Sequence, residues 1–179
     1  QVLKTLFFFF FLVFLVVLVF LQDLKSTIIP SISAVVALVG TFFCLTLFGF
    51  SINMLTLFAL VLAIGIVVDD AIVVVEAVHA KLQAGEKSTY KATSDAMGEI
   101  SGAVISISLV MSAVFVPVSF MAGPTGVFYK QFALTLASAV ILSALNALTL
   151  SPVLCTILIR HQHGEKRSFF NKLATSFNA

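Results

Sequence analysis

The chain has 179 residues, of which 60% are hydrophobic and only 10% are charged, and its mean hydropathy is +1.17. This composition excludes an ordinary soluble domain and indicates an integral membrane protein whose main partner is the lipid bilayer. The net charge of +2 suggests no nucleic-acid partner. Cys44 and Cys155 lie inside apolar runs, so we expect them to act as small apolar residues and not as a disulfide framework.

Apolar runs of about 20 residues predict five membrane-spanning helices and therefore an all-α bundle. They fall at about residues 5–21, 28–48, 52–75, 100–121 and 132–159. The first run lacks a small-residue cleavage site, which argues against a signal peptide. Turns are predicted at "FGFSIN" and at "AGPTG", because both stretches are rich in turn-forming residues. Pro117 and Pro152 lie inside the last two spans and are expected to kink them.

Two polar segments lie outside the spans. Residues 83–99 are predicted to form a cytoplasmic connector with a short helix after Ser88. Residues 161–179 follow the membrane domain of residues 1–160, and their apolar and basic residues at helical spacing predict a helix on the cytoplasmic membrane surface. His161, His163 and Glu165 have ligand chemistry, but spacing alone is weak evidence and no metal is expected.

The positive charges predict the orientation. If the N-terminus lies outside, only Lys4 and Lys130 are external, and eight basic residues are cytoplasmic: Lys25, Lys81, Lys87, Lys91, Arg160, Lys166, Arg167 and Lys172. An odd number of spans then places the C-terminus in the cytoplasm of a multi-pass protein. Because the sequence begins without Met at the edge of a span, we expect it to be a piece of a longer protein.

The third span contains two adjacent aspartates, Asp69 and Asp70, in an otherwise apolar stretch. A charge near the bilayer centre costs at least about 2.5–3.5 kcal/mol, so these carboxylates need a proton, a partner or a function. No Lys, Arg or His occurs within the other four spans. Either protons neutralise the pair, or a cation comes from a helix outside this sequence. Neighbouring carboxylates titrate as a coupled pair, so we predict a proton or cation coupling site.

Helical spacing assigns the two aspartates to different faces. Asp70 shares a face with small residues, which predicts close contact with another helix: Thr56, Ala59, Ala63 and Ala77. Asp69 is turned about 100° away, towards Gly65 and Glu76. Gly65 leaves room there for a bulky partner side chain, and Glu76 is expected at the membrane interface.

Polar residues in the last two spans also share faces. Ser101, Ser108, Ser112 and Ser119 do so in the fourth span, and Thr135, Ala139, Ser143 and Asn146 in the fifth. We interpret both sets as helix-packing residues, with a proton or water path as the alternative.

Two other classes of function fit less well. An intramembrane aspartyl protease needs carboxylates that face each other from separate helices, whereas here both are on one helix. A structural membrane anchor would explain the spans but not the aspartates. We therefore expect no enzymatic activity.

Three stretches make the sequence resemble the resistance-nodulation-division (RND) efflux transporters, and most closely their hydrophobe/amphiphile multidrug branch. They are "GFSINMLTLFALVLAIGIVVDDAIVVVE", "FMAGPTGVFYKQFALT" and "LSPVLC". The adjacent aspartates after Gly65 are the most specific element, since metal-exporting relatives arrange their acids differently. One departure is Ala122, where the family often has glycine.

The resemblance implies a proton-driven efflux transporter of the bacterial inner membrane, with Asp69 and Asp70 as proton-relay carboxylates and protons in place of a cofactor. It places this chain at the second to sixth membrane helices of the N-terminal half. A second half of the same polypeptide would supply the missing lysine. The implied assembly is a homotrimer with a periplasmic adaptor and an outer-membrane channel. A relative that exports lipids or assists protein secretion is the alternative within this class.

Overall fold

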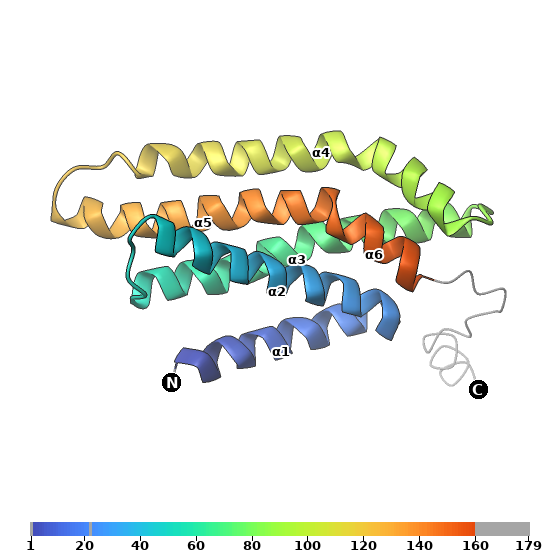
Figure 1. Ribbon diagram of the computed structural model, residues 1–179, viewed down its shortest axis with the longest axis horizontal. Coiled ribbons are helices and arrows are strands. Elements are labelled where there is room, and N and C mark those ends of the chain that lie inside the picture. The colour runs from blue at the N-terminus through green and yellow to red at the C-terminus, as the bar shows by residue number, and fades with distance from the viewer. Residues whose placement is uncertain (1, 22, 160–179) are drawn as a thin grey trace, which may run out of the picture.

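The computed structural model describes residues 2–21 and 23–159, which form helices and, within these ranges, no strand. The helices are α1 (Val2–Leu21), α2 (Leu24–Leu47), α3 (Met54–Gln83), α4 (Thr89–Val118), α5 (Pro124–Leu148) and α6 (Leu150–Leu158). They lie side by side in one bundle, in which α6 continues from α5 with a bend (Figure 1). The predicted all-α membrane fold is confirmed.

The described helices match the lengths that a bilayer requires. Four stretches are long and apolar enough to cross it: Leu24–Leu47, Met54–Gln83, Thr89–Val118 and Thr125–Leu158, the last of which combines α5 and α6. α1 contains a shorter apolar stretch, Phe7–Val19, and packs against α2 and α3.

The centre of the bundle is formed by α3 and α5. α3 contacts all the other described helices, and α5 contacts α2, α3, α4 and α6. Small side chains line the α3–α5 contact, including Ala59, Ala63 and Ala139, each at most 1% exposed, so the two backbones approach closely. By contrast, only 11% of the apolar window of α4 is buried, so most of this helix faces out of the bundle.

The turn before α3 is determined by local chemistry. Gly49 adopts a φ of 68°, a conformation that glycine tolerates well. The Asn53 side chain then accepts hydrogen bonds from the backbone N–H groups of Leu55 and Thr56, and Thr56 Oγ1 accepts from the Asn53 N–H at 2.8 Å. This capping box starts α3. Asn53 also donates to the Gln131 side chain, which ties the start of α3 to α5.

The turn before α5 requires two glycines. Gly123 has a φ of 95° and precedes Pro124, which occupies the first turn of the helix. Gly126 is packed against the end of the preceding segment, because a Cβ there would lie 2.2 Å from the Met121 carbonyl oxygen. Both predicted turns are therefore present, and each depends on glycine.

The polar connector predicted for residues 83–99 is largely helical. α3 continues to Gln83, about two turns beyond the predicted end of its span, and α4 begins directly after its N-cap Ser88. The helix predicted after Ser88 is present, but the expectation that it is short was wrong, because one helix runs from Thr89 to Val118 through the predicted start of the fourth span. No proline interrupts it there, and exposed polar side chains let it continue.

The two prolines predicted to kink the last spans act differently. α4 ends one residue after Pro117, so that span is terminated and not bent in its middle. The predicted single helix over 132–159 is divided at Thr149, three residues before Pro152. Proline has no N–H to donate to the carbonyl four residues earlier, which weakens the helix at this point. The predicted surface helix over 161–179 and the His161, His163 and Glu165 group lie outside the described residues.

Candidate functional site

Asp70 faces α5, where it accepts a hydrogen bond. Ser143 Oγ donates to Asp70 Oδ2 across 2.5 Å, and the Ser143 side chain is only 1% exposed. A bond from a buried hydroxyl to a carboxylate provides one of the few polar contacts available in an apolar bundle. The expectation that Asp70 faces protein agrees with this geometry.

Apolar layers enclose the Asp70–Ser143 contact on both sides along the helices. One cluster includes Ala63 of α3 and Ala139 of α5. Another includes Val74 of α3 and Ala147 of α5. These four side chains are at most 1% exposed, so the polar contact lies between two dry layers of the α3–α5 interface. Such surroundings strengthen electrostatic interactions and make an uncompensated negative charge on Asp70 costly.

Asp69 lies on a different and uncovered face of α3. Its side chain is exposed, and a Cβ built on neighbouring Gly65 would meet no atom within 4 Å. Leu62 and Val73 on the same face are 48% and 44% exposed, and Glu76 is also exposed. The described bundle therefore leaves open the room that the sequence predicts beside Gly65.

Within the part of the chain that the structure describes, no lysine, arginine or histidine forms an ion pair with Asp69 or Asp70. Lys81 binds Glu99 at 2.5 Å, which joins the end of α3 to α4. The aspartates thus remain uncompensated by the described residues.

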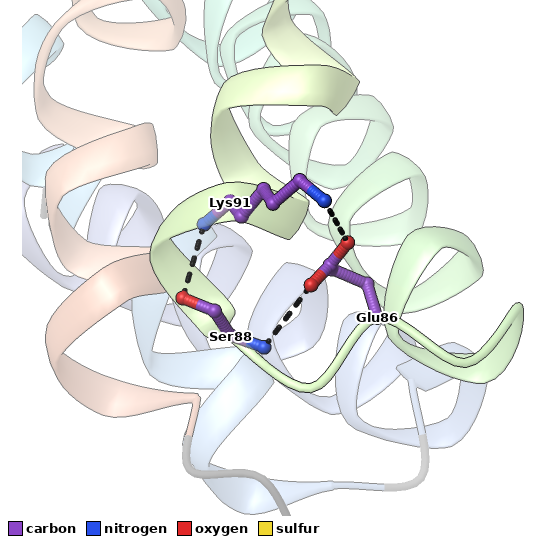
Figure 2. Close-up of polar contacts among 3 residues, drawn as sticks. All are labelled: Glu86, Ser88 and Lys91. Carbon is purple, nitrogen blue, oxygen red and sulfur yellow. Dashed lines mark hydrogen bonds and ion pairs between the residues drawn. The ribbon is translucent and has the colours of Figure 1, made fainter.

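The loop before α4 has its own polar cluster. Figure 2 shows the Glu86 carboxylate accepting from the Ser88 backbone N–H at 3.4 Å and from Lys91 Nζ at 3.0 Å. Ser88 Oγ accepts from the Lys91 backbone N–H and so caps α4. The hydrogen bond from Lys91 lowers the pKa of Glu86 below its ordinary value of 4.5. These residues stabilise a helix start and lie outside the aspartate site.

Three of the six hydroxyls that the sequence assigns to packing bind their own helix. Ser108 donates to the Val104 carbonyl, Ser119 to Val116 and Thr135 to Gln131. Ser143 is different, because it crosses to Asp70, a role that the residue spacing did not predict. Its position in the small-residue stripe of the fifth span is the signal that pointed towards the contact. Cys44 and Cys155 are free thiols, and Cys155 is fully buried in an apolar cluster.

The sequence is similar to those of known membrane transporters. The sequence pattern of the AcrB/AcrD/AcrF family matches residues 1–179. The multidrug export protein AcrF of Escherichia coli is 47% identical over 182 residues, covering 99% of this chain and 18% of AcrF. The toluene efflux pump membrane transporter TtgE of Pseudomonas putida is 47% identical over 163 residues, covering 89% of this chain and 16% of TtgE.

A third relative agrees with these two. The solvent-resistant pump membrane transporter SrpB of Pseudomonas putida is 44% identical over 174 residues, covering 95% of this chain and 17% of SrpB. The chain therefore spans less than a fifth of the length of these relatives. Because the family pattern covers the whole chain, α3 and its two aspartates included, the chain belongs to the AcrB/AcrD/AcrF family of RND multidrug efflux transporters.

Proposed function

We propose that this chain is part of a proton-coupled efflux transporter and that Asp69 and Asp70 take up and release the protons. The observation that carries the proposal is that the two acids have different surroundings. Asp70 is held by Ser143 within the bundle, while Asp69 lies on an open face beside Gly65. Intramembrane carboxylates without a cation are functional sites by default.

The open face of α3 is the place where a compensating cation would approach. We propose that it comes from a helix in the second half of the same polypeptide, because no described residue of this chain supplies it. Gly65 leaves space for a long basic side chain to reach Asp69. With both carboxylates ionised, the cation would be drawn towards α3.

Protonation would then release the cation and change the packing of α3 against that helix. Two packings with different proton affinities are what coupling requires, since a proton shifts an equilibrium only through its differential affinity for the two states. Protons would arrive from outside and leave to the cytoplasm. The helix movement would be passed to the substrate-handling parts of the transporter.

The orientation, assembly and substrates follow as parts of the same proposal. The lysines and arginines favour an external N-terminus and a cytoplasmic C-terminus in the bacterial inner membrane. Family membership supports a homotrimer that works with a periplasmic adaptor and an outer-membrane channel. The names of the relatives favour small apolar or amphiphilic substrates. Export of lipids, or assistance in protein secretion, is the alternative.

An intramembrane protease finds less support. Asp69 and Asp70 point to different faces of one helix and do not face each other across a cleft. A dyad that shares one proton needs carboxylates close together and directed at the same bond. A transporter accounts for both acids, whereas a protease leaves their geometry unexplained.

Substitution of each aspartate in the complete transporter tests the proposal. Asp69→Asn and Asp70→Asn keep the side-chain volume but remove the titration, so each should abolish proton-driven efflux in reconstituted liposomes. Glu76→Gln is the matched control, because Glu76 is an exposed acid further along the same helix, and it should retain efflux.

Measuring the amount of assembled trimer separates a role of the aspartates in transport from a purely structural role. Stranding a buried partner charge typically costs several kcal/mol, so purely structural aspartates would reduce assembled protein and efflux in proportion. Normal assembly with lost efflux supports the relay. Undiminished proton-driven efflux in the double asparagine variant would overturn it.

A further inference from the structure

Ser33 of α2 binds both sides of the break between α5 and α6. Its backbone carbonyl accepts a hydrogen bond from Asn146 Nδ2 of α5 at 3.2 Å. Its Oγ lies 3.0 Å from Ser151 Oγ of α6, and both hydroxyl side chains are buried, at 1% and 0% exposure. One residue of α2 therefore contacts the last turns of α5 and the first turn of α6.

The break itself has little local support. Thr149 ends α5 and precedes α6 without a side-chain cap, and its hydroxyl donates back to the Leu145 carbonyl of its own helix. Pro152 cannot supply the backbone N–H that would continue the helix. The direction of the bend must therefore be set by contacts with other helices, and the polar contacts to α2 are those through Asn146 and Ser151.

The same segment of α5 carries the donor to Asp70. Ser143 and Asn146 are three residues apart, about one helical turn, so they move together as parts of one rigid element. The bond from Asn146 to α2 restrains the rotation of this turn, and a rotation of the turn would also move Ser143 Oγ relative to Asp70. The two interhelical contacts are thus mechanically linked through α5.

We propose that Asn146 and Ser33 are positioning residues for the proton site, which hold α5 and α6 on α2 so that Ser143 stays directed at Asp70. The proposal rests on the proposed function only in that Asp70 takes up a proton. It assigns α2 as the helix whose position responds to a change at Asp70, because α2 holds both ends of the bent segment.

Other charges near Asp70 are few on the described helices that pack against α3. Asp69 is its neighbour, and Glu76, His79 and Lys81 lie further along α3. The charged side chains of the other helices lie towards helix ends or in the N-terminal part of α4: Lys4 on α1, Asp23 and Lys25 at the start of α2, Lys91, Asp95 and Glu99 on α4, and Lys130 on α5. The Ser143 hydroxyl is accordingly the polar group of α5 that meets Asp70.

Infrared difference spectroscopy of the complete transporter tests this role. The band of the protonated Asp70 carboxyl is identified by its loss in Asp70→Asn and is titrated in an Asp69→Asn background. Asn146→Leu should move the midpoint in the same direction as Ser143→Ala, by about half a pH unit or more, which is about a threefold change in proton affinity. Asn146→Gln keeps an amide donor, so its midpoint should lie closer to that of the parent protein.

Two serine variants test the contact between α2 and α6 separately from the contact between α2 and α5. They also keep the test informative if Asn146→Leu misfolds. Ser33→Ala keeps the carbonyl that Asn146 binds but removes the contact with Ser151. The midpoint of the Asp70 titration should therefore shift by the same amount in Ser33→Ala, in Ser151→Ala and in the double variant, with no additive effect. Ser106→Ala is the control, because Ser106 is exposed and donates only to Gly102 of its own helix. If Asn146→Leu does not assemble, the serine variants decide the question.

The outcomes also distinguish this proposal from the proposed function. A midpoint that moves in Ser143→Ala but stays at the parent value in Asn146→Leu, Ser33→Ala and Ser151→Ala would overturn the positioning role and leave the relay intact. If the Asp70 carboxyl titrates and responds to Asn146→Leu, but the transporter with both aspartates intact shows no proton-driven efflux, the proposed function is contradicted instead.

Discussion

Ser143 and Asp70 are 73 residues apart in the sequence, yet Ser143 Oγ donates a hydrogen bond to Asp70 Oδ2 between two dry layers of the α3–α5 interface. Replacing Ser143 with alanine removes this donor without adding volume. Hydrogen bonds to charged groups contribute about 1.5–3 kcal/mol, so we expect proton-driven transport to slow by about tenfold or more. Transport rate per amount of assembled transporter is the measurement, with Ser106→Ala as the control. A rate equal to that of the parent would show that the contact is dispensable.

Gly65 provides a test of the open face beside Asp69. Gly65 is helical, and no atom lies within 4 Å of a Cβ built there, so the described bundle itself tolerates a larger side chain. Gly65→Leu should nevertheless abolish transport, because it would fill the space through which the proposed basic side chain would reach Asp69. Gly102→Leu is the matched control, since Gly102 is an equally open glycine on α4. If both variants transport normally, no helix approaches α3 at Gly65.

Gly126 should be intolerant of any side chain for a structural reason. An alanine Cβ would lie 2.2 Å from the Met121 carbonyl oxygen, so the turn before α5 would have to shift. Overpacking of this kind costs about 1–3 kcal/mol, and backbone atoms yield less readily than side chains. We expect Gly126→Ala to lower the thermal stability of the complete transporter, as measured by loss of assembled protein on heating. Gly102→Ala should leave it unchanged.

The loop before α4 should respond to pH through Glu86. Its pKa is lowered in the folded protein, so its contribution to the loop is complete above the ordinary value of 4.5 and is lost as the pH falls through the lower, folded value. We expect the protection of the Ser88 and Lys91 amides, measured as the intrinsic exchange rate at each pH divided by the observed rate, to fall over that acidic range. Glu86→Gln should make this protection insensitive to pH there. Equal pH dependence in both proteins would exclude Glu86 as the cause.

The topology is testable by labelling single cysteines in intact cells after Cys44 and Cys155 have been replaced. With an external N-terminus, a cysteine at Lys87 should react only from the cytoplasm, and one at Ala122 only from outside. Both positions are exposed in the turns between helices. Reaction of the Lys87 position with an impermeant reagent added outside would reverse the proposed orientation.

The sequence by itself determined the membrane class, the helical nature of the chain and the positions of its main turns. Each depends on local chemistry: apolar length for the spans, Asn53 as a cap for α3, and glycine with proline for the start of α5. It also predicted that Asp70 faces protein and that Gly65 leaves room, because helical periodicity assigns faces before any neighbour is known.

The tertiary structure alone decided which groups meet. Ser143 and Ser108 are both serines among small residues, yet one binds Asp70 and the other its own helix. The division of the last span at Thr149 and its attachment to Ser33 likewise depend on a neighbour distant in sequence. Periodicity specifies the faces of a helix but not its partner, its rotation or its height, and these are fixed by the simultaneous packing of several helices.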